Sequence, residues 1–377
     1  MTTLSPLLAR LEQYPFARLD DWRAEARGRG IDVIDFGVGD PREPTPALVR
    51  EALAAGIPEV SSYPRAGGLA AYREAVAAWI GRRFGVSVDP ETEIIPTLGS
   101  KEAIFSFAQV ATSPGRRLVA IPDLAYPVYE RGALFAGAEV VTIPLSEERG
   151  WLPDLEAFDR WDELALLWTC YPNNPTGATA PLSVYEELAS RAREHDFLLC
   201  SDEAYSELWF GEQPASALQV GDRRNVVVFN TLSKRSSMTG MRCGFVCAPG
   251  DVCDALRAFR PSVGTAPQEF VQRAGVAALS DERHVEEVRD VYRRKRETLL
   301  PVLEGKGLRL AGGDATFFLW LAVEGSSEAF AHRLLDAGIL VAPGSFFGPG
   351  GEGCVRMALV PTQAECERAA EILEGVL

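Results

Sequence analysis

Residues 164–177, LALLWTCYPNNPTG, decide the fold, because an apolar run typical of a buried strand ends there in a loop of turn-forming residues. Two later segments repeat the arrangement, FLLCSDEAY at 197–205 and NVVVFNTLSK at 225–234. Between the first two lies the helical pattern SVYEELASRAREHD, for which Ser183 and Glu186 predict a capping box at the start. Continuous apolar strands separated by helices predict a mostly parallel sheet covered on both faces.

The rest of the sequence extends this pattern into a large and a small domain. Further strand-like runs are RLVAI (117–121), EVVTI (139–143) and CGFVCA (243–248). The last third of the chain opens with a long charged helical pattern and ends in a helix that Thr362 and Glu365 are predicted to cap. We therefore expect an α/β three-layer sandwich with a mostly parallel sheet over residues 46–270. Residues 1–45 and 271–377 are expected to form a smaller α+β domain.

Charge and composition exclude several classes of function. The 377 residues carry 38 Lys and Arg against 53 Asp and Glu, which gives a net charge of −15. A field of that sign repels nucleic acid and anionic membranes, so we expect neither as a partner. The basic run at 293–296 is interpreted as a solvated helix face. Because no apolar run approaches the length of a membrane span, we expect a cytoplasmic protein.

The cysteines and histidines argue against a metal site. Seven cysteines include no C-x-x-C pair, and several lie within apolar runs, which predicts buried reduced thiols. The three histidines are isolated from one another, so we predict no bound metal.

Lysine is rare in this sequence, and one lysine has an unusual position. Of the four, Lys295 and Lys306 lie in charged or Gly-flanked contexts that predict exposure. Lys234 follows the apolar run 225–230, and the carboxyl end of a parallel strand is where open α/β sheets bind ligands. A nucleophilic lysine is one interpretation, and an ordinary surface lysine on a loop is the other.

Other polar side chains follow the same edge of the predicted sheet. Asp202 and Tyr205 come directly after one strand, where the carboxylate could face a cationic ligand group or simply cap a helix. Asn174 lies in the turn after another strand and could donate its amide to a ligand oxygen. Gly99 and Ser100 open an amphipathic helix, whose free N–H groups would suit a phosphate.

In this order, the motifs resemble those of the class I/II aminotransferases, a fold-type I family that uses pyridoxal 5'-phosphate. The resemblance covers nearly the whole chain. It rests on the segments GVGDP (37–41), SYPRAGG (62–68), GSKE (99–102), PDLAYPVY (122–129), YPNNPTG (171–177), SDEAY (201–205), TLSKRSSMTGMRCGF (231–245) and CVRMAL (354–359). The resemblance implies an aspartate aminotransferase type of fold and a ping-pong transfer of an amino group between an amino acid and a 2-oxo acid.

The resemblance also implies which residues hold the ring of the cofactor. Lys234 is implied to bond covalently to the cofactor aldehyde and to move protons. Asp202 is implied to keep the ring nitrogen protonated. Tyr205 and Asn174 would bind the phenolic oxygen, and Tyr126 would stack on the ring face.

The same resemblance assigns the phosphate and the substrate. Residues implied to surround the phosphate are Gly99, Ser100, Lys101, Thr231 and Arg242. Tyr63 is implied to reach the phosphate of a neighbouring subunit, which predicts a homodimer. Arg356 is implied to bind the substrate α-carboxylate through two hydrogen bonds, beside Asn174, and Gly39 to let backbone approach the substrate.

For the substrate, the sequence most resembles N-succinyl-LL-2,6-diaminopimelate aminotransferases of lysine biosynthesis, with glutamate and 2-oxoglutarate as the second pair. Arg42 or Arg65 would then bind the extra carboxylates, unless both are merely exposed arginines. Alternatives are free LL-diaminopimelate, aspartate or alanine as donor. A β-eliminating lyase that uses the same cofactor shares the fold and stays open.

Overall fold

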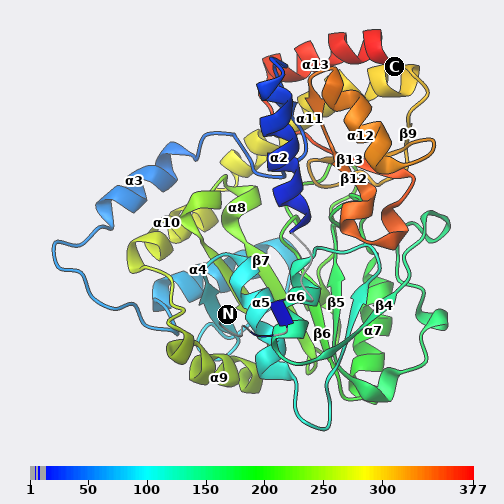
Figure 1. Cartoon of the computed structure of the whole chain (residues 1–377). Coiled ribbons are helices and arrows are strands. Elements are labelled where there is room, and N and C mark those ends of the chain that lie inside the picture. The colour runs from blue at the N-terminus through cyan, green and yellow to red at the C-terminus, as the bar shows by residue number, and fades with distance from the viewer. Residues whose placement is uncertain (1–4, 6, 9–13) are drawn as a thin grey trace.

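The computed structural model describes residues 5, 7, 8 and 14–377 of the chain. Figure 1 shows a lower lobe built around a large sheet and an upper lobe that carries the C-terminal helices. The lower sheet has seven strands in the order β2-β8-β7-β6-β5-β3-β4. The strands are β2 (Ile94–Thr97), β3 (Leu118–Pro122), β4 (Glu139–Ile143), β5 (Leu164–Cys170), β6 (Leu198–Asp202), β7 (Val226–Thr231) and β8 (Gly244–Cys247).

The sheet is mostly parallel, as predicted. In the described chain, β8 is antiparallel to both β7 and β2, and the pairs β7–β6, β6–β5, β5–β3 and β3–β4 are parallel. Because parallel strands need crossover connections, helices cover the sheet. They are α4 (Ala70–Phe84), α5 (Ser100–Ala111), α6 (Val128–Phe135), α7 (Leu182–Glu194), α9 (Gly250–Phe259) and α10 (Glu269–Ser280).

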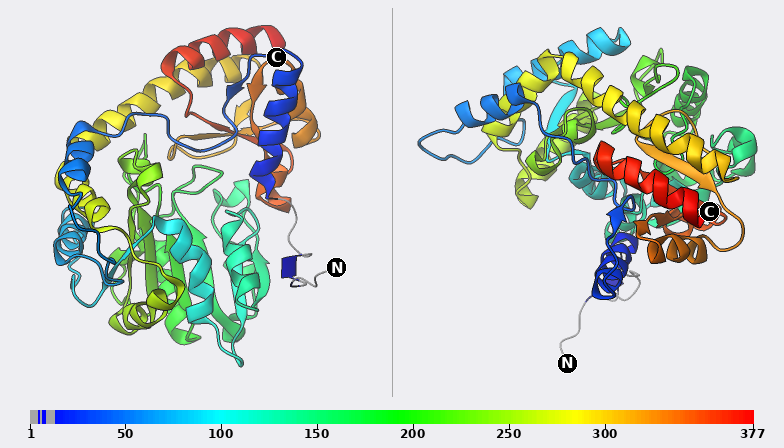
Figure 2. Two further views of the ribbon diagram at one scale, coloured as in Figure 1. Left: turned by 60° about the vertical axis from the view of Figure 1, so that its left-hand side comes forward. Right: turned by 90° about the horizontal axis from the view of Figure 1, so that it is seen from above.

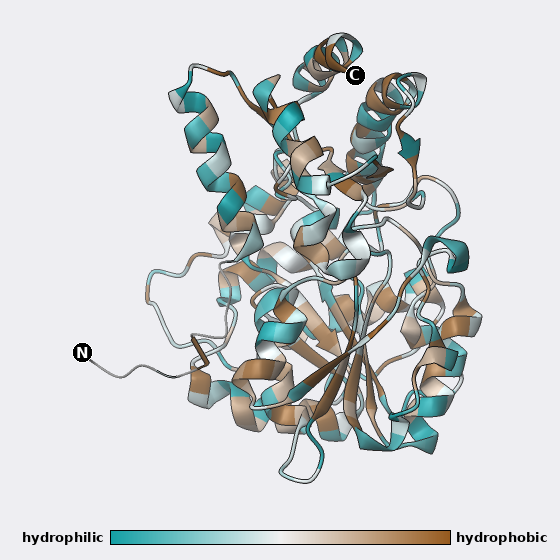
Figure 3. Ribbon diagram, turned by 45° about the vertical axis from the view of Figure 1, so that its right-hand side comes forward, coloured by the Kyte–Doolittle hydropathy of each residue, from teal (hydrophilic) through white to brown (hydrophobic). Residues whose placement is uncertain are grey.

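Each strand of this sheet contributes side chains to two cores. Along β7, Val226 and Val228 belong to the core that includes side chains of α4 and α7. Val227 and Phe229, between and after them, belong to the core that includes side chains of α5, α6 and α9. Alternation along a strand sends neighbouring side chains to opposite faces, so both faces of the sheet are apolar. The brown strands of Figure 3 show this continuous hydrophobicity.

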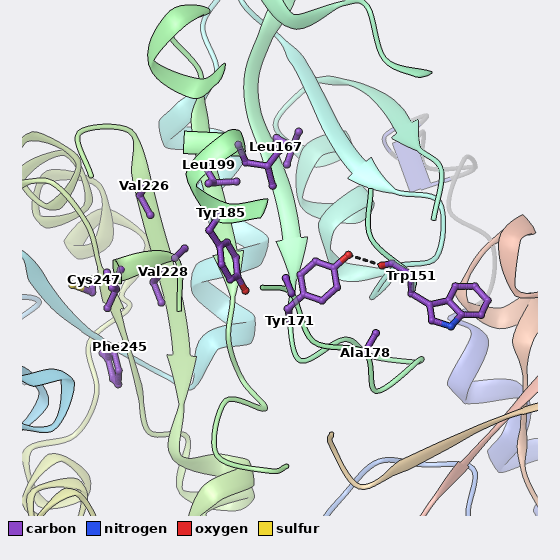
Figure 4. Close-up of a cluster of buried hydrophobic side chains, with 14 of the residues drawn as sticks. Trp151, Leu167, Tyr171, Ala178, Tyr185, Leu199, Val226, Val228, Phe245 and Cys247 are labelled. Atoms are coloured by element: carbon purple, nitrogen blue, oxygen red, sulfur yellow. Dashed lines mark hydrogen bonds between the residues drawn. The ribbon is translucent and has the colours of Figure 1, made fainter. Parts of the chain in front are cut away.

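Figure 4 shows part of the first of these cores, where Tyr185 of α7 lies beside the strands. The same view shows Tyr171, at the end of β5, donating its hydroxyl to the carbonyl oxygen of Trp151 at 2.6 Å. This bond fixes the start of the loop that follows β5. The loop therefore leaves the sheet in a defined direction.

The upper lobe contains a second, antiparallel sheet in the order β12-β13-β10-β9. Its strands are β9 (Arg309–Leu310), β10 (Phe318–Ala322), β12 (Ala342–Pro343) and β13 (Cys354–Ala358). Helices of this lobe are α2 (Pro15–Gly28), α11 (Arg283–Gly305), α12 (Ser327–Asp336) and α13 (Gln363–Val376). In Figure 2 the long α11 lies beside α13 at the outer side of the lobe.

The N-terminal segment joins the upper lobe through a short parallel pair, β1 (Ile34–Asp35) with β11 (Ile339–Leu340). After β1 the chain passes the strand ends of the lower sheet that face the upper lobe and leads to α3 (Ala47–Ala55). The domain boundaries at residues 46 and 270 stay a prediction.

Of the two predicted helix caps, the one at the start of α7 is wrong. Ser183 does not cap α7, which begins at Leu182 after Pro181 and has no side-chain cap. Proline fixes its own φ and favours extended ψ before the helix, so Pro181 ends the preceding segment two residues before the serine. By contrast, the capping box of Thr362 and Glu365 at the start of α13 is present.

The basic run on α11 is only partly a solvated face, since Arg294 is exposed and Arg293 is half-buried. Lys295 is 1% exposed and Arg296 is buried, because this side of α11 faces the body of the upper lobe. The expected exposure of Lys295 is therefore wrong, whereas Lys306 is exposed. All seven cysteines are buried and free of disulfides, as predicted. Among the described helices, none is both long enough and apolar enough to cross a bilayer.

Candidate active site

A cavity of about 590 Å³ lies where the carboxyl ends of β5, β6 and β7 face the upper lobe. It collects side chains from both lobes and from the segment after β1. Eleven of the predicted site residues line it, namely Gly39, Ser100, Lys101, Tyr126, Asn174, Asp202, Tyr205, Thr231, Lys234, Arg242 and Arg356. Gly99 lies behind this lining at the start of α5, and Tyr63 is fully exposed elsewhere on the surface.

Lys234 projects from α8 (Leu232–Arg235), the single turn that follows β7. Its Nζ donates a hydrogen bond to the carbonyl oxygen of Gly39 at 2.7 Å and lies 5.9 Å from the centre of the Tyr205 ring. Burial lowers the pKa of Lys234 to about 8, although the nearby Asp40 carboxylate opposes that shift. A lysine of lowered pKa has more of the neutral amine that acts as nucleophile or base.

Asp202 is the last residue of β6, and its side chain is nearly buried. Its carboxylate accepts a hydrogen bond from the Tyr129 hydroxyl at 2.8 Å and another from the Ala204 N–H at 3.2 Å. Burial raises the pKa of Asp202 to about 6, although the bond from Tyr129 lowers it. No basic side chain in the described residues forms an ion pair with this carboxylate. A buried acid without a cationic partner suits a protonated ligand nitrogen.

An anion site lies at the start of α5. Gly99 has φ 70° and no side chain caps the helix, so its first N–H groups are available. The Arg242 guanidinium is held over this point by the carbonyl oxygens of Thr239 at 2.8 Å and Leu98 at 3.0 Å. A Cβ at Gly99 would lie 2.5 Å from Arg242 Nη2, which explains the glycine there. Helix N-terminus and guanidinium together suit a phosphate.

Thr231, at the junction of β7 and α8, also lines the cavity. Thr231 caps that turn, because its Oγ1 accepts a hydrogen bond from the Ser233 N–H at 3.2 Å. The Ser233 side chain lines the cavity too, although it was not among the predicted residues. Its position within TLSK, beside the predicted lysine, was the signal that could have revealed it.

Arg356 lies on β13 and is 2% exposed. Its Nη1 donates to Asn174 Oδ1 at 2.7 Å and its Nη2 to the carbonyl oxygen of Gly37 at 2.8 Å. The guanidinium packs over the Phe318 ring at 4.2 Å from the ring centre. Burial lowers its pKa to about 10, so it stays charged at neutral pH. Its Nε is buried and has no hydrogen-bond partner in the described chain.

The sequence did not reveal several further residues that lie in the cavity or directly behind its lining. Tyr129, which binds Asp202, lies within the quoted segment 122–129, but the two residues are 73 positions apart. Tyr14 and Phe16 line the cavity from the start of α2, and Phe318 comes from β10. No local pattern marks these aromatic residues, since only the folded chain brings them to the cavity.

Comparison with known proteins identifies the family. The family "Aminotransferase class I and II" matches residues 31–373. The chain belongs to this family. The LL-diaminopimelate aminotransferase of Aquifex aeolicus (strain VF5) is 42% identical to this aminotransferase over 383 residues, covering 99% of each protein. The prediction of a pyridoxal-phosphate-dependent aminotransferase is therefore confirmed.

Solved structures show the same fold in related enzymes. A probable N-succinyldiaminopimelate aminotransferase of Thermus thermophilus has a TM-score of 0.89 at 32% identity, covering 96% of this chain and 100% of that one. The aspartate aminotransferase of Thermus thermophilus with maleate has a TM-score of 0.91 at 31% identity, covering 100% of both chains. The predicted aspartate aminotransferase type of fold is confirmed.

The cavity of this aminotransferase fits pyridoxal 5'-phosphate. The carboxylate of Asp202, which has no ion pair within the described residues, suits the ring nitrogen, and the helix start at Ser100 with Arg242 suits the phosphate. When bound, this cofactor supplies an aldehyde carbon and an electron-withdrawing ring that accepts charge from the substrate α-carbon. The protein side chains hold, orient and exchange protons around it.

Proposed function

We propose that this aminotransferase moves an amino group from LL-diaminopimelate to 2-oxoglutarate in lysine biosynthesis, by a ping-pong mechanism. The observation that carries this proposal is a second cationic position at the cavity rim, apart from Arg356. Lys101 lines this cavity and Arg131 lines the adjoining one, and Lys101 Nζ lies 5.4 Å and the Arg131 guanidinium 5.1 Å from the centre of the Tyr14 ring, which lines both. A substrate with a second carboxylate can bind both positions, whereas a monocarboxylic amino acid cannot.

The names of similar proteins support the same substrate. The Aquifex aeolicus protein, 42% identical, is called an LL-diaminopimelate aminotransferase. N-succinyl-LL-2,6-diaminopimelate is the second candidate, favoured by the quoted motifs and by the name of the Thermus thermophilus structure at 32% identity. Both substrates place a carboxylate far from the reacting amine.

The expectation that Arg42 or Arg65 binds the distal carboxylate does not agree with the geometry. Arg42 forms an ion pair with Glu365 at 3.0 Å and lines a neighbouring cavity. Arg65 is exposed and lines neither of these cavities. We therefore assign the distal carboxylate to Arg131, which lines the cavity that adjoins the first one at Tyr14, Lys101 and Arg242.

We assign the reacting groups as follows. The amine of Lys234 would bond to the cofactor aldehyde, and as a free base it would move the proton at the substrate α-carbon. Asp202 holds the charge of the ring nitrogen, and Tyr129 orients that carboxylate. Tyr205 and Asn174 bind the phenolic oxygen. Borohydride reduction of the holoenzyme should fix the cofactor to Lys234, and peptide mapping checks this; a label on any other lysine would contradict the assignment.

The remaining assignments concern the ring face, the phosphate and the substrate. Tyr126 stacks on the ring, and the phosphate lies among Gly99, Ser100, Lys101, Thr231 and Arg242. Arg356 binds the α-carboxylate. A Cβ at Gly39 would lie 3.0 Å from the Phe318 ring, so glycine there lets the backbone pack closely against a ring that lines the cavity.

Two further parts of the proposal concern the assembly and its location. Tyr63 is 100% exposed in this single chain, which agrees with a role toward a neighbouring subunit of a homodimer. The cytoplasmic location stays a prediction that cell fractionation would check.

The substrate is tested with purified enzyme and a panel of donors, with 2-oxoglutarate as acceptor. We expect LL-diaminopimelate to give a higher kcat/KM than its N-succinyl derivative, aspartate or alanine. Faster turnover of the N-succinyl derivative would favour the second candidate. Release of ammonia and pyruvate from cysteine, without need for a 2-oxo acid, would instead indicate the lyase.

The rim assignment has its own test. Arg131→Ala should raise KM for LL-diaminopimelate about tenfold through loss of one charged contact, and should leave KM for alanine unchanged. Arg42→Ala is the matched control and should change neither. An equal rise for both donors in Arg131→Ala would contradict the assignment.

A further inference from the structure

The segment 37–43 connects the upper lobe to the reacting groups. Its Gly37 carbonyl oxygen accepts from Arg356 Nη2 at 2.8 Å, and its Gly39 carbonyl oxygen accepts from Lys234 Nζ at 2.7 Å. The Asp40 side chain lines the cavity. A shift of this segment would therefore move the partners of the carboxylate-binding arginine and of the lysine at once.

The far end of the segment is attached to α11 by a buried ion pair. Glu43 contacts Nζ of Lys295, whose side chain is 1% exposed, while that of Glu43 is 19% exposed. Removing a lysine from water is costly unless a carboxylate compensates for it. The Tyr292 ring, one turn earlier on α11, lies 5.2 Å from the same Nζ and is fully buried. Lys295 is thus held on both sides.

From the geometry we infer that the ion pair between Lys295 and Glu43 is a positioning pair for the active site, which fixes the segment 37–43 over the cavity. Neither residue lines the cavity. Each acts through the segment, so neither is a catalytic residue. The sequence marked Lys295 only as part of an exposed basic run, and no assigned function used it.

Aromatic packing also links this part of α11 to Lys234. The Tyr292 ring lies 5.1 Å from the Phe317 ring, whose centre is 5.4 Å from Lys234 Nζ. Lys295, Tyr292 and Phe317 therefore form a continuous packed support between α11 and the reacting lysine. Rigid support of this kind keeps a site within the small tolerance that efficient chemistry needs.

A second ion pair on the same segment provides a matched control. Arg42 pairs with Glu365 of α13 at 3.0 Å, with side chains 49% and 29% exposed. Solvent screens such a pair, so its loss should have little effect. Breaking the two pairs separately compares a buried and an exposed attachment of one segment.

The test uses the holoenzyme and the half-reaction with whichever amino donor is fastest, because every donor carries the α-carboxylate that Arg356 binds. We expect Lys295→Met and Glu43→Gln to raise KM about tenfold, with kcat changed by less than about threefold. Arg42→Ala should leave both constants unchanged. The double variant Lys295→Met/Glu43→Gln should be no worse than the poorer single variant, since both remove one interaction.

Hydrogen exchange without substrate provides a readout that does not depend on activity. We expect faster exchange in residues 37–43 of Lys295→Met and Glu43→Gln, and unchanged exchange in β5, β6 and β7. An unchanged KM with unchanged exchange at 37–43 would overturn the inference. So would faster exchange throughout the molecule with an equal loss of kcat and kcat/KM, because it would indicate a general loss of stability. If Lys295→Met does not fold, Glu43→Gln carries the test alone.

This inference does not depend on LL-diaminopimelate. A different preferred donor would contradict the proposed substrate and leave the positioning pair to be tested with that donor.

Discussion

Lys234 and Asp202 carry charges of opposite sign in a place where little water reaches them. Burial moves both pKa values toward neutrality, that of Lys234 to about 8 and that of Asp202 to about 6. Each group therefore has a free-energy cost in the folded protein that a ligand can relieve. A protonated ring nitrogen beside Asp202 relieves one of them, so cofactor binding and stability should be coupled.

Asp202→Asn tests the free-energy cost of the buried carboxylate in the apoprotein. The folded pKa of about 6 lies above the unfolded value of 3.8, so the folded state binds the extra proton between those pH values. The wild-type carboxylate therefore destabilises the apo fold progressively as pH rises through this window, by up to about 3 kcal/mol above pH 6. Relative to wild type, the free energy of unfolding of Asp202→Asn should rise between pH 4 and pH 7, measured by urea denaturation. A difference independent of pH would contradict the buried, unpaired carboxylate.

Arg356→Lys tests the carboxylate site. The guanidinium offers Nε and further donors in one plane, whereas an ammonium group offers a single point of charge. Loss of one charge-assisted bond should raise KM for every amino donor by about tenfold to a hundredfold. Steady-state kinetics with donors that have and lack a distal carboxylate checks this. A rise confined to dicarboxylic donors would instead place Arg356 at the distal end.

At the scale of elements, close packing of α5 against α6 sets the position of the phosphate site. A Cβ at Gly132 of α6 would lie 2.5 Å from the carbonyl oxygen of Phe105 in α5. Backbone therefore meets backbone at this contact, with no flexible side chain to move aside. Since α5 carries Ser100 at its start, any separation of the two helices would also move the anion site.

Gly132→Ala should lower the free energy of unfolding by about 1–3 kcal/mol, because the added methyl group overpacks this contact. Gly81→Ala is the matched control within α4, where the nearest atom to the new Cβ, the Val86 carbonyl oxygen, lies 3.8 Å away. That substitution should stabilise the protein by about 0.5–1 kcal/mol through better helix propensity. Urea denaturation of both variants measures the difference. Equal effects would show that the contact between α5 and α6 can relax freely.

At the scale of the whole molecule, the cavity lies between the lobes, and one expected cofactor contact lies on the outer surface. Tyr63 is fully exposed, as are much of Ile57 and Val60 in the same connection between α3 and α4. A neighbouring subunit would cover these side chains, and Tyr63 would then lie at the cavity of that neighbouring subunit.

Sedimentation velocity should therefore give about twice the chain mass of 41.0 kDa. Tyr63→Phe should keep that mass and weaken cofactor binding, measured by titration of apoprotein, because only the hydroxyl is lost. A monomer that is fully active would contradict both expectations.

The sequence predicted the strands more accurately than the helix starts and the exposure of charged side chains. The apolar runs of β3, β5, β6, β7 and β8 were recognisable because strands buried on both faces are continuously apolar, whereas the edge strand β4 is only partly buried. The predicted start of α7 was wrong, because the helix begins directly after Pro181 and Ser183 lies inside its first turn. Lys295 was misjudged because charge alone does not show that Glu43, 252 residues away, is present to compensate for it.

The sequence by itself determined the order of the elements and the chemistry at the strand ends. Alternation, turn residues and motif order depend on residues that are close together in the sequence, so they can be predicted from it. Only the tertiary structure decided which contacts hold the side chains at the strand ends in place. The bond from Tyr129 to Asp202, the contacts of Arg356 with Asn174 and Gly37, and the attachment of segment 37–43 to α11 join residues far apart in the chain. Such contacts depend on how distant elements pack in the folded chain, and no spacing along the chain encodes them.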